Sequence, residues 1–408
     1  MRILWIGHFP PYPPKGGMML RSYNMLVELA REHEITLVAP IRRDVLAGMY
    51  DDVETGVNEC RAALGRICAK LVLIEANIGD SKARKYEVGL TSLFRGRPYS
   101  VDWFASAEFM NHVSSELNAG GIDLIHLDTV SMLQHVPYQS THKLVINHHN
   151  IESDMVQVRA SRASNPLSKW YLSREARYLR DYERSECRRA ILHLTCSPED
   201  TNRLLAIDSE LQAVEIPNGV DTGFFEPKDA TDDQDSMIFV GGLSWYPNRD
   251  AMEYFASDVW PILAKRRPTA SFELVGKHPS RRLRALAKDD GRFRVHGFVD
   301  DIRPMVSNAK VYVCPIRDGG GTKLKILDAM AMGKAIVAHP HAVDGINLQD
   351  EVDVLLARTP KEFCAQIERV FDDANLRERL EVAARSLAVQ EYSYASIGRQ
   401  LRDLYRSL

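Results

Sequence analysis

Three consecutive glycines, Gly319 to Gly321, stand directly before a run with helical periodicity that carries one carboxylate among apolar residues. The stretch is DGGGTKLKILDAMAMGK, residues 318–334, and the carboxylate is Asp328. Glycine permits backbone angles that other residues avoid, and the first amides of a helix are unfilled donors that attract anions. Lys323 and Lys325 add positive charge beside them. The pattern predicts a site for a diphosphate.

The position of Asp328 extends this prediction. In a helix that rises about 1.5 Å per residue, Asp328 is expected roughly 10 Å along the axis from the glycines. The diphosphate and the ribose of a nucleotide are separated by a comparable span. The sequence therefore predicts that Asp328 binds the ribose of a nucleotide whose phosphates rest on the glycines. The alternative is a glycine-rich loop followed by a carboxylate that faces solvent.

A second glycine pair follows the first apolar run of the chain, in GHFPPYPPKGGMMLRSYN. Gly16 and Gly17 precede a predicted helix that begins near residue 18, at the carboxyl end of a strand, where open α/β sheets bind their ligands. Two such loops predict phosphate-binding elements in two domains. Neither loop matches the G-x-G-x-x-G pattern, which makes a nicotinamide-dependent enzyme a poorer interpretation.

Polar residues also gather in DLIHLDTVSM, residues 123–132, and KLVINHHNIES, residues 143–153. They lie at or after the ends of predicted strands: His126, Asp128, His148, His149, Asn150 and Glu152. His126 and His148 are expected to alternate into the sheet as core histidines. His149 and Asn150 fall in a loop, where a catalytic or binding role is expected. A metal site is an alternative, but the spacing matches no strong ligand motif, so no metal ligand is assigned.

The elements that must position these groups alternate between short apolar runs and longer amphipathic ones, which is typical of parallel sheets crossed by helices. The predicted strands form two similar sets: 2–8, 34–39, 70–76, 122–127, 143–148 and 190–196, then 236–241, 270–275, 293–298, 309–315, 334–338 and 352–357. The fold class is therefore α/β with two doubly wound domains. Turn residues and then acidic residues between 211 and 236 predict the connection.

Composition limits the function classes. The chain has 408 residues, 45% of them apolar, and a formal net charge of −3, which argues against nucleic acid as a partner. No apolar run approaches the ~20 residues of a membrane span, and Met1 leads directly into MRILWIGHF without a signal-peptide pattern. A cytoplasmic protein is expected. The six cysteines form no CxxC pair, and buried thiols are the interpretation of Cys196 and Cys314.

Residues 152–189 predict a long polar helix or a pair of helices rich in arginine and aromatic residues. Such a face can rest on the inner surface of an anionic membrane, so a weak, peripheral membrane contact is one interpretation. Acidic residues are interspersed, and a solvated face with ion pairs between neighbouring turns is the favoured one.

Five segments, taken together, resemble the family-four retaining glycosyltransferases of the GT-B fold (glycosyltransferase group 1). They are IPNGVD (216–221), MIFVGGLSWYPNRDA (237–251), ELVGK (273–277), VHGFVDDI (295–302) and GGGTKLKILDAMAMGKAIV (319–337). The resemblance implies two Rossmann-like domains that face a central cleft. Residues 1–205 with a final helix at about 393–408 would bind the acceptor, and residues 206–392 would bind the nucleotide-sugar donor. No cofactor and no metal are implied.

The resemblance also assigns residues of the donor site. Asp328 falls where the family has its ribose-binding glutamate. Gly320, Gly321 and Thr322 fall in the loop that meets the donor sugar and the diphosphate. The Gly16–Gly17 pair would face the same phosphates from the first domain.

Further positions follow from the same resemblance. Lys277 and the Phe298–Val299 backbone fall where the base is contacted, and Gly242 belongs to the phosphate-facing segment. His149 resembles a first-domain histidine that lines the sugar pocket.

The sequence departs from the family pattern at the diphosphate. The first of two glutamates is Gly320 here, an arginine after FVG is Gly242, and the lysine that usually follows has no counterpart in SWYPNRD. Lys323 is the first candidate for the missing counter-charge, ahead of Arg317 and Lys15.

The sequence therefore predicts a metal-independent retaining glycosyltransferase that acts in glycan, polysaccharide, glycolipid or glycosylated-metabolite biosynthesis. Its donor would be a UDP- or GDP-linked sugar and its acceptor a hydroxyl of a glycan, a lipid-linked compound or a small molecule. Asp128, Asn150 and Glu152 are the predicted acceptor-side residues, and His149, Lys323 and Gly320–Thr322 the catalytic ones. The alternatives are a nucleotide-sugar epimerase, a non-catalytic sugar-nucleotide-binding partner, and a metal hydrolase built on His126, Asp128 and His149. Oligomeric state is left open.

Overall fold

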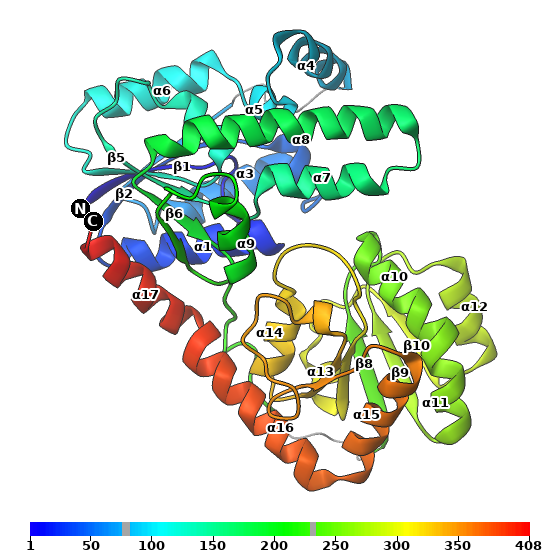
Figure 1. Ribbon diagram of the computed structural model, residues 1–408. Coiled ribbons are helices and arrows are strands. Elements are labelled where there is room, and N and C mark those ends of the chain that lie inside the picture. The colour runs from blue at the N-terminus through cyan, green and yellow to red at the C-terminus, as the bar shows by residue number, and fades with distance from the viewer. Residues whose placement is uncertain (76–81, 229–233) are drawn as a thin grey trace. The chain divides into compact units, whose positions relative to one another are not determined.

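Figure 1 shows the computed structural model, which describes residues 1–75, 82–228 and 234–408. These residues form two compact units. The first comprises Met1–Pro217 and Gly398–Leu408, and the second comprises Asn218–Ile397. In the described residues, no helix has both the length and the apolar character needed to cross a bilayer.

The first unit is built on a parallel sheet whose strands are ordered β3-β2-β1-β4-β5-β6-β7. This order reverses direction between β1 and β4, which is the switch point of a Rossmann-like sheet and the place where such sheets bind ligands. The strands are β1 (Arg2–Ile6), β2 (Glu34–Pro40), β3 (Lys70–Ile74), β4 (Leu124–Leu127), β5 (Lys143–Asn147), β6 (Leu192–Thr195) and β7 (Ala213–Glu215).

Helices lie against both faces of this sheet (Figure 1). Helix α1 begins at Gly17, the second glycine of the pair, and its buried side holds Met25, Leu26 and Leu29. The helices are α1 (Gly17–Ala30), α2 (Arg43–Leu46), α3 (Val53–Leu64), α4 (Lys82–Arg95), α5 (Tyr99–Trp103), α6 (Ala107–Asn118), α7 (Glu152–Arg162), α8 (Pro166–Glu186) and α9 (Pro198–Leu205), with 3-10 turns η1 (Val130–His135) and η2 (Cys187–Arg189).

The second unit repeats this topology. Its parallel sheet has the order β10-β9-β8-β11-β12-β13, so its switch point lies between β8 and β11. The strands are β8 (Ser236–Val240), β9 (Ser271–Val275), β10 (Phe293–Gly297), β11 (Val311–Cys314), β12 (Ala335–Ala338) and β13 (Leu355–Leu356).

The core of the second unit packs aromatic rings from helices against rings from the sheet. Phe255 stacks on Phe272, and Phe272 stacks on Phe293. The helices are α10 (Tyr246–Tyr254), α11 (Trp260–Arg266), α12 (Arg281–Asp289), α13 (Arg303–Asn308), α14 (Leu324–Ala331), α15 (Pro360–Asp372), α16 (Ala374–Leu387) and α17 (Tyr394–Arg406), with the π-helical segments η3 (Phe255–Val259) and η5 (Ala388–Tyr392) and the 3-10 turn η4 (Pro340–Ala342). From Gly398 onward, α17 belongs to the first unit.

The predicted α/β class with two Rossmann-like domains is confirmed. Every predicted strand is present, and the polar region 152–189 is a helix pair, α7 and α8. One strand was missed: β7 lies inside the expected connection and pairs with β6, so the first unit extends to Pro217. A strand of three residues is too short to show periodicity. Part of the expected acidic connection, residues 229–233, lies outside the described residues.

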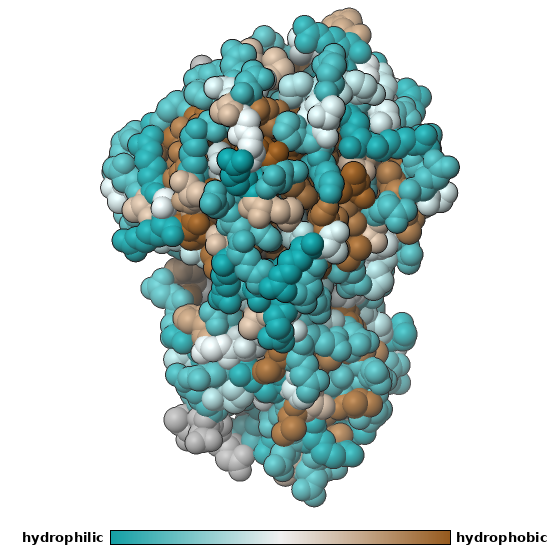
Figure 2. All heavy atoms as spheres, turned by 90° about the vertical axis from the view of Figure 1, so that its left-hand side faces the viewer, coloured by the Kyte–Doolittle hydropathy of each residue, from teal (hydrophilic) through white to brown (hydrophobic). Residues whose placement is uncertain are grey.

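Hydrophilic side chains cover most of the face drawn in Figure 2, and hydrophobic ones occur in smaller groups. All six cysteines are buried and free, which confirms the interpretation of Cys196 and Cys314 as buried thiols.

Candidate active site

The backbone is crowded at the carboxyl ends of β8 and β9 in the second sheet. Gly241 follows β8, and Gly276 follows β9. A Cβ at position 276 would lie 2.1 Å from the carbonyl oxygen of Gly241, so this crossing requires glycine. Gly242, which stands where the family has an arginine, is exposed and offers no charge.

The glycine-rich loop after β11 reaches this edge in an unusual backbone conformation. Gly319 and Gly321 have φ angles of 101° and 73°, which favour glycine strongly, and a Cβ at position 319 would also meet Pro247 at 2.7 Å. No atom lies within 4 Å of the Cβ position of Gly320. The hydroxyl oxygen of Thr322 is shielded from solvent and has no hydrogen-bond partner among the described residues. The loop therefore offers open backbone and an unused hydroxyl.

The helix begins later than the sequence suggested. Helix α14 starts at Leu324, and Lys323 caps it with φ −85° and ψ 89°. The helical rise therefore applies only from Leu324 to Asp328, and the expected 10 Å between the glycines and Asp328 does not follow from helix geometry. The correction arises because positive-φ glycines cannot continue into a helical turn.

Lys323 is tied to the loop itself. Its side chain is buried, and Nζ donates hydrogen bonds to the carbonyl oxygens of Gly319 at 2.6 Å and Gly321 at 2.7 Å. This arrangement fixes the loop and uses two of the three donors of the ammonium group.

Lys325 is the lysine at the switch point. Its Nζ donates a hydrogen bond to Oδ1 of Asn248 and lies 4.5 Å from the centre of the Phe239 ring. A Cβ at position 241 would lie 2.5 Å from this Nζ, so Lys325 approaches the backbone at Gly241 closely. Burial lowers the pKa of Lys325 to about 8, against the opposing influence of Cys314 and Asp328. The sequence analysis placed positive charge from both lysines near the glycines but chose Lys323, not Lys325, as the counter-charge.

Asp328 lies one turn along α14 from Lys325. It is half-buried, and its carboxylate accepts no hydrogen bond from any described residue. Burial raises its pKa to about 7, and the nearby Lys325 opposes that rise. A carboxylate in this setting gains free energy when a ligand hydroxyl donates to it. The alternative of a freely solvated surface aspartate does not match this environment.

A cation and an aromatic ring follow the next two strands. Lys277 follows β9, and its Nζ lies 4.1 Å from the centre of the Phe298 ring. Phe298 is exposed and Val299 half-buried, both directly after β10. This pair offers a flat apolar surface and donors at the same edge of the sheet as Lys325.

In the first unit, Gly16 caps helix α1 with a φ angle of 95°, and Gly17 is the first residue of the helix. Both are exposed, and no atom lies within 4 Å of the Cβ position of Gly16. The first amides of α1 are therefore open at the carboxyl edge of the first sheet.

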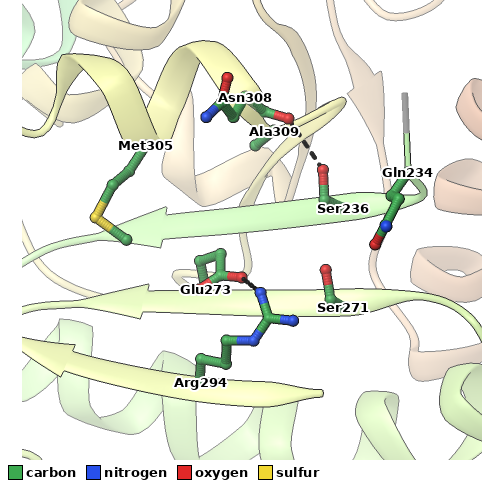
Figure 3. Close-up of a pocket in the computed structure, with 8 residues that line it drawn as sticks. All are labelled: Gln234, Ser236, Ser271, Glu273, Arg294, Met305, Asn308 and Ala309. Carbon is green, nitrogen blue, oxygen red and sulfur yellow. Dashed lines mark hydrogen bonds and ion pairs between the residues drawn. The ribbon is translucent and has the colours of Figure 1, made fainter. Parts of the chain in front are cut away.

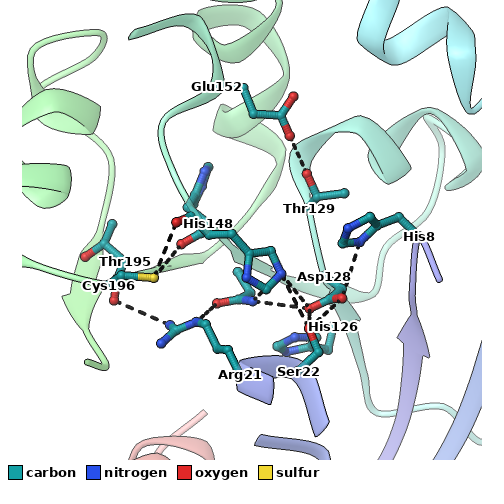
Figure 4. Close-up of polar contacts among 12 residues, drawn as sticks. His8, Arg21, Ser22, His126, Asp128, Thr129, His148, Glu152, Thr195 and Cys196 are labelled. Atoms are coloured by element: carbon teal, nitrogen blue, oxygen red, sulfur yellow. Dashed lines mark hydrogen bonds and ion pairs between the residues drawn. The ribbon is translucent and has the colours of Figure 1, made fainter. Parts of the chain in front are cut away.

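A polar centre forms around Asp128 at the switch point of the first sheet (Figure 4). The buried Asp128 follows β4 and accepts hydrogen bonds from the hydroxyl of Ser22 at 2.8 Å and from Nδ2 of Asn147 at 3.2 Å. Two imidazoles complete its contacts: Nδ1 of His8 and Nε2 of His149 each lie 3.3 Å from a carboxylate oxygen. Asp128 thereby fixes both rings.

The protonation of this centre follows from its contacts. Burial acts to raise the pKa of Asp128, but His149 and His8 outweigh it and hold that pKa well below the ordinary range. Burial lowers the pKa of His149, and Asp128 opposes that change. The carboxylate is thus ionised at neutral pH. The sequence missed His8, Ser22 and Asn147, since they come from separate segments that only the fold brings together.

The other predicted first-domain residues have different surroundings. His126 is buried, stacks on Trp5 and bonds to Tyr405, so it is a core histidine and does not join His149. The metal-hydrolase set of His126, Asp128 and His149 is therefore wrong in its first member, because His126 lies inside strand β4 with its ring on Trp5 and Tyr405, and His8 takes its place beside Asp128 and His149.

His148 is likewise buried, and its Nε2 contacts Nδ1 of His193 at 3.0 Å. Glu152 accepts hydrogen bonds from Thr129 and Ser131, and Figure 4 shows it apart from Asp128. Asn150 is half-buried in the turn after β5 and has no side-chain hydrogen bond to a described residue.

Two groups of side chains could hold a metal ion in the described part of the chain. One is His8, Asp128 and His149, and the other is His148, Cys187 and His193. The first offers the nitrogen and oxygen ligands that zinc accepts.

A cavity of about 310 Å³ lies elsewhere in the second unit (Figure 3). Ser236 and Ser271, which line it, are the first residues of β8 and β9, and Glu273 pairs with Arg294 beside them. The cavity is therefore at the amino ends of the strands, opposite the edge where parallel sheets bind substrates.

The sequence of the second unit matches a known protein family. Residues 234–373 match the model of the family described as glycosyl transferases group 1. The matched residues lie within the second unit. The chain is 27% identical over 264 residues to the alpha-D-kanosaminyltransferase of Streptomyces kanamyceticus. The match covers 60% of this chain and 65% of that relative, slightly less than two thirds of its length.

Solved structures of the same fold cover nearly the whole chain. A sucrose-phosphate synthase from Thermosynechococcus elongatus superposes with a TM-score of 0.69 at 16% identity, over 100% of this chain and 98% of that one. Anabaena Alr3699/HepE, solved in complex with UDP and glucose, gives a TM-score of 0.63 at 15% identity over 100% of both chains. The resemblance to the family-four GT-B glycosyltransferases is thus confirmed at the level of family and fold.

Proposed function

We propose that this protein is a retaining glycosyltransferase that moves a sugar from a nucleoside-diphosphate sugar to a hydroxyl acceptor. The observation that carries the proposal is the pair formed by Lys325 and Asp328 on α14. A half-buried ammonium group, and a carboxylate that accepts no hydrogen bond from any described residue, occupy the switch point of a Rossmann-like sheet. These are the charges needed for a diphosphate and for ribose hydroxyls, respectively.

The glycine-rich loop and helix α14 bind different parts of the donor. The open backbone at Gly320 and Gly321, with the Thr322 hydroxyl, binds the diphosphate, and Lys323 holds the loop carbonyls so that the amides stay in place. Lys325 supplies the counter-charge that Gly242 lacks. Lys277 and Phe298 form the surface for the base.

Transfer of the sugar requires little covalent participation by protein side chains. The bond between the anomeric carbon and the diphosphate oxygen breaks, and the acceptor oxygen bonds to that carbon on the same face. The acceptor proton passes to the departing phosphate oxygen, so no protein base is required. Donors aimed at the leaving diphosphate stabilise the charge that develops there.

The first unit contributes His149, held by Asp128, to binding of the sugar, and the exposed amides of α1 at Gly16 and Gly17 to binding of the phosphates. Fixing the His149 ring removes rotamer freedom before the sugar binds, which strengthens the contact. Asn150 is an acceptor-side candidate, because its amide is unused among the described residues. The bonds of Glu152 to Thr129 and Ser131 favour a structural role for it.

The donor tested first should be a uridine diphosphate sugar, because HepE was solved with UDP and glucose and shares the fold. Guanosine diphosphate sugars are the second class. The acceptor is a hydroxyl of a glycan, a lipid-linked compound or a small molecule, and the protein works in the cytoplasm.

The test is a panel of UDP- and GDP-sugars scored for release of free nucleoside diphosphate, without acceptor and with excess chelator. We expect slow release from one donor that chelator leaves unchanged. Epimerised sugar nucleotide without release would identify an epimerase. No turnover of any donor would identify a binding protein, and release that chelator abolishes would point to the His8, Asp128 and His149 group as a metal centre.

A further inference from the structure

Helix α4 presents large apolar side chains to solvent on the side that faces away from its own domain. Tyr86, Leu90 and Phe94 are 73%, 57% and 90% exposed. They recur every four residues and so form one stripe along the helix. Val88 and Ser92 are buried on the opposite side. An outward helix face in a soluble domain is normally polar, so this stripe is a candidate docking surface.

Helix α8 extends the stripe. The Arg174 guanidinium donates a hydrogen bond to the carbonyl oxygen of Leu93 at 2.7 Å and lies 5.7 Å from the centre of the Trp170 ring, which joins the two helices. Figure 1 shows α4 next to α8. Trp170 and Leu167 are 57% and 77% exposed. We define the α4–α8 patch as Tyr86, Leu90, Phe94, Leu167 and Trp170.

Positive charge surrounds the patch. Lys85, Arg95, Lys169 and Arg177 are exposed, and none of them forms an ion pair with a carboxylate in the described residues. Glu87 is the only acidic residue in the sequence of α4. The rim therefore carries positive charge that no ion pair among the described residues neutralises.

We infer that the α4–α8 patch docks on the surface of an anionic lipid bilayer. Aromatic and aliphatic side chains framed by lysine and arginine are the composition of interfacial helices, because the rings enter the headgroup region while the cations meet lipid phosphates. The charge complementarity of the rim selects a membrane over a second copy of this chain, whose patch would carry the same positive rim. The inference is independent of the chemistry proposed for α14.

The test is flotation of the full chain with vesicles of phosphatidylcholine alone and of phosphatidylcholine mixed with an equal amount of phosphatidylglycerol. We expect binding to the mixed vesicles that weakens as salt increases. The double variant Leu90→Ser with Phe94→Ser should lose at least roughly tenfold in partitioning. Val382→Ser is the matched control, since Val382 on α16 is 63% exposed and lies outside the patch.

The melting temperature of the double variant, measured by circular dichroism, must match that of the wild-type protein, as expected for substitutions at exposed positions. Absence of wild-type binding to mixed vesicles, or equal binding by the double variant, would overturn the inference. So would a dimer, detected by light scattering, that the double variant abolishes while vesicles bind neither protein; the patch would then join two copies of the chain.

Discussion

Lys325 Nζ donates a hydrogen bond to Asn248 Oδ1, so the segment that lacks the family's lysine receives one from helix α14. The two residues are 77 positions apart in sequence. Asn248 in turn donates to the carbonyl oxygen of Gly242 at 2.9 Å, which places the ammonium group beside the position of the missing arginine. One half-buried lysine thereby stands close to two of the three departures from the family pattern, the missing arginine and the missing lysine.

Lys325→Gln should weaken the affinity for UDP about 10- to 100-fold, because a charge-assisted hydrogen bond to phosphate contributes about 1.5–3 kcal/mol. Lys323→Gln is the matched variant. It should lower the melting temperature more than the affinity, since Lys323 binds the carbonyls of Gly319 and Gly321. Calorimetric titration of UDP into both proteins separates the two roles. A larger loss of affinity in Lys323→Gln than in Lys325→Gln would assign the counter-charge to Lys323.

The affinity for UDP-glucose should pass through a maximum between about pH 7 and pH 8. Asp328 must be ionised to accept from ribose, and its pKa is raised to about 7. Lys325 must be protonated, and its pKa is lowered to about 8. Asp328→Asn should remove the decrease in affinity below the maximum, and Lys325→Gln should remove the decrease in affinity above it. A flat profile in the unchanged protein would contradict the assignment of both groups.

The same raised pKa predicts a stability effect without ligand. The folded state binds the Asp328 proton more tightly than the unfolded state does, so stability present below about pH 4 declines as pH rises towards about 7. Asp328→Asn should therefore raise the melting temperature by roughly 2–4 °C at pH 8 and change it little at pH 4.

His149→Ala should reduce turnover strongly while UDP affinity stays nearly intact, because His149 belongs to the Asp128 centre and not to the α14 site. Asp128→Asn should also lower turnover, since a neutral amide holds the His149 ring less firmly. A parallel loss of melting temperature and UDP affinity in His149→Ala would make it a structural residue of the first unit.

Apolar runs were sufficient to predict every strand of both sheets except β7, because buried parallel strands are continuous apolar runs and β7 has only three residues. The site was predicted less well for two reasons. Gly319 and Gly321 adopt positive φ angles that delay α14 to Leu324, and such angles cannot be inferred from glycine content alone. The Asp128 centre draws Ser22 from α1 and Asn147 from β5, and residues so distant in sequence carry no spacing signal.

Calorimetric titration of UDP into the unchanged protein, Asp328→Asn and Asp328→Glu tests the donor site most directly. The account predicts an affinity roughly 10- to 100-fold weaker in Asp328→Asn, and substantial binding in Asp328→Glu, because a carboxylate on a longer side chain can still accept from the ribose hydroxyls. Unchanged affinity in Asp328→Asn would show that Asp328 does not bind the ribose and would remove the central support for the proposed donor site.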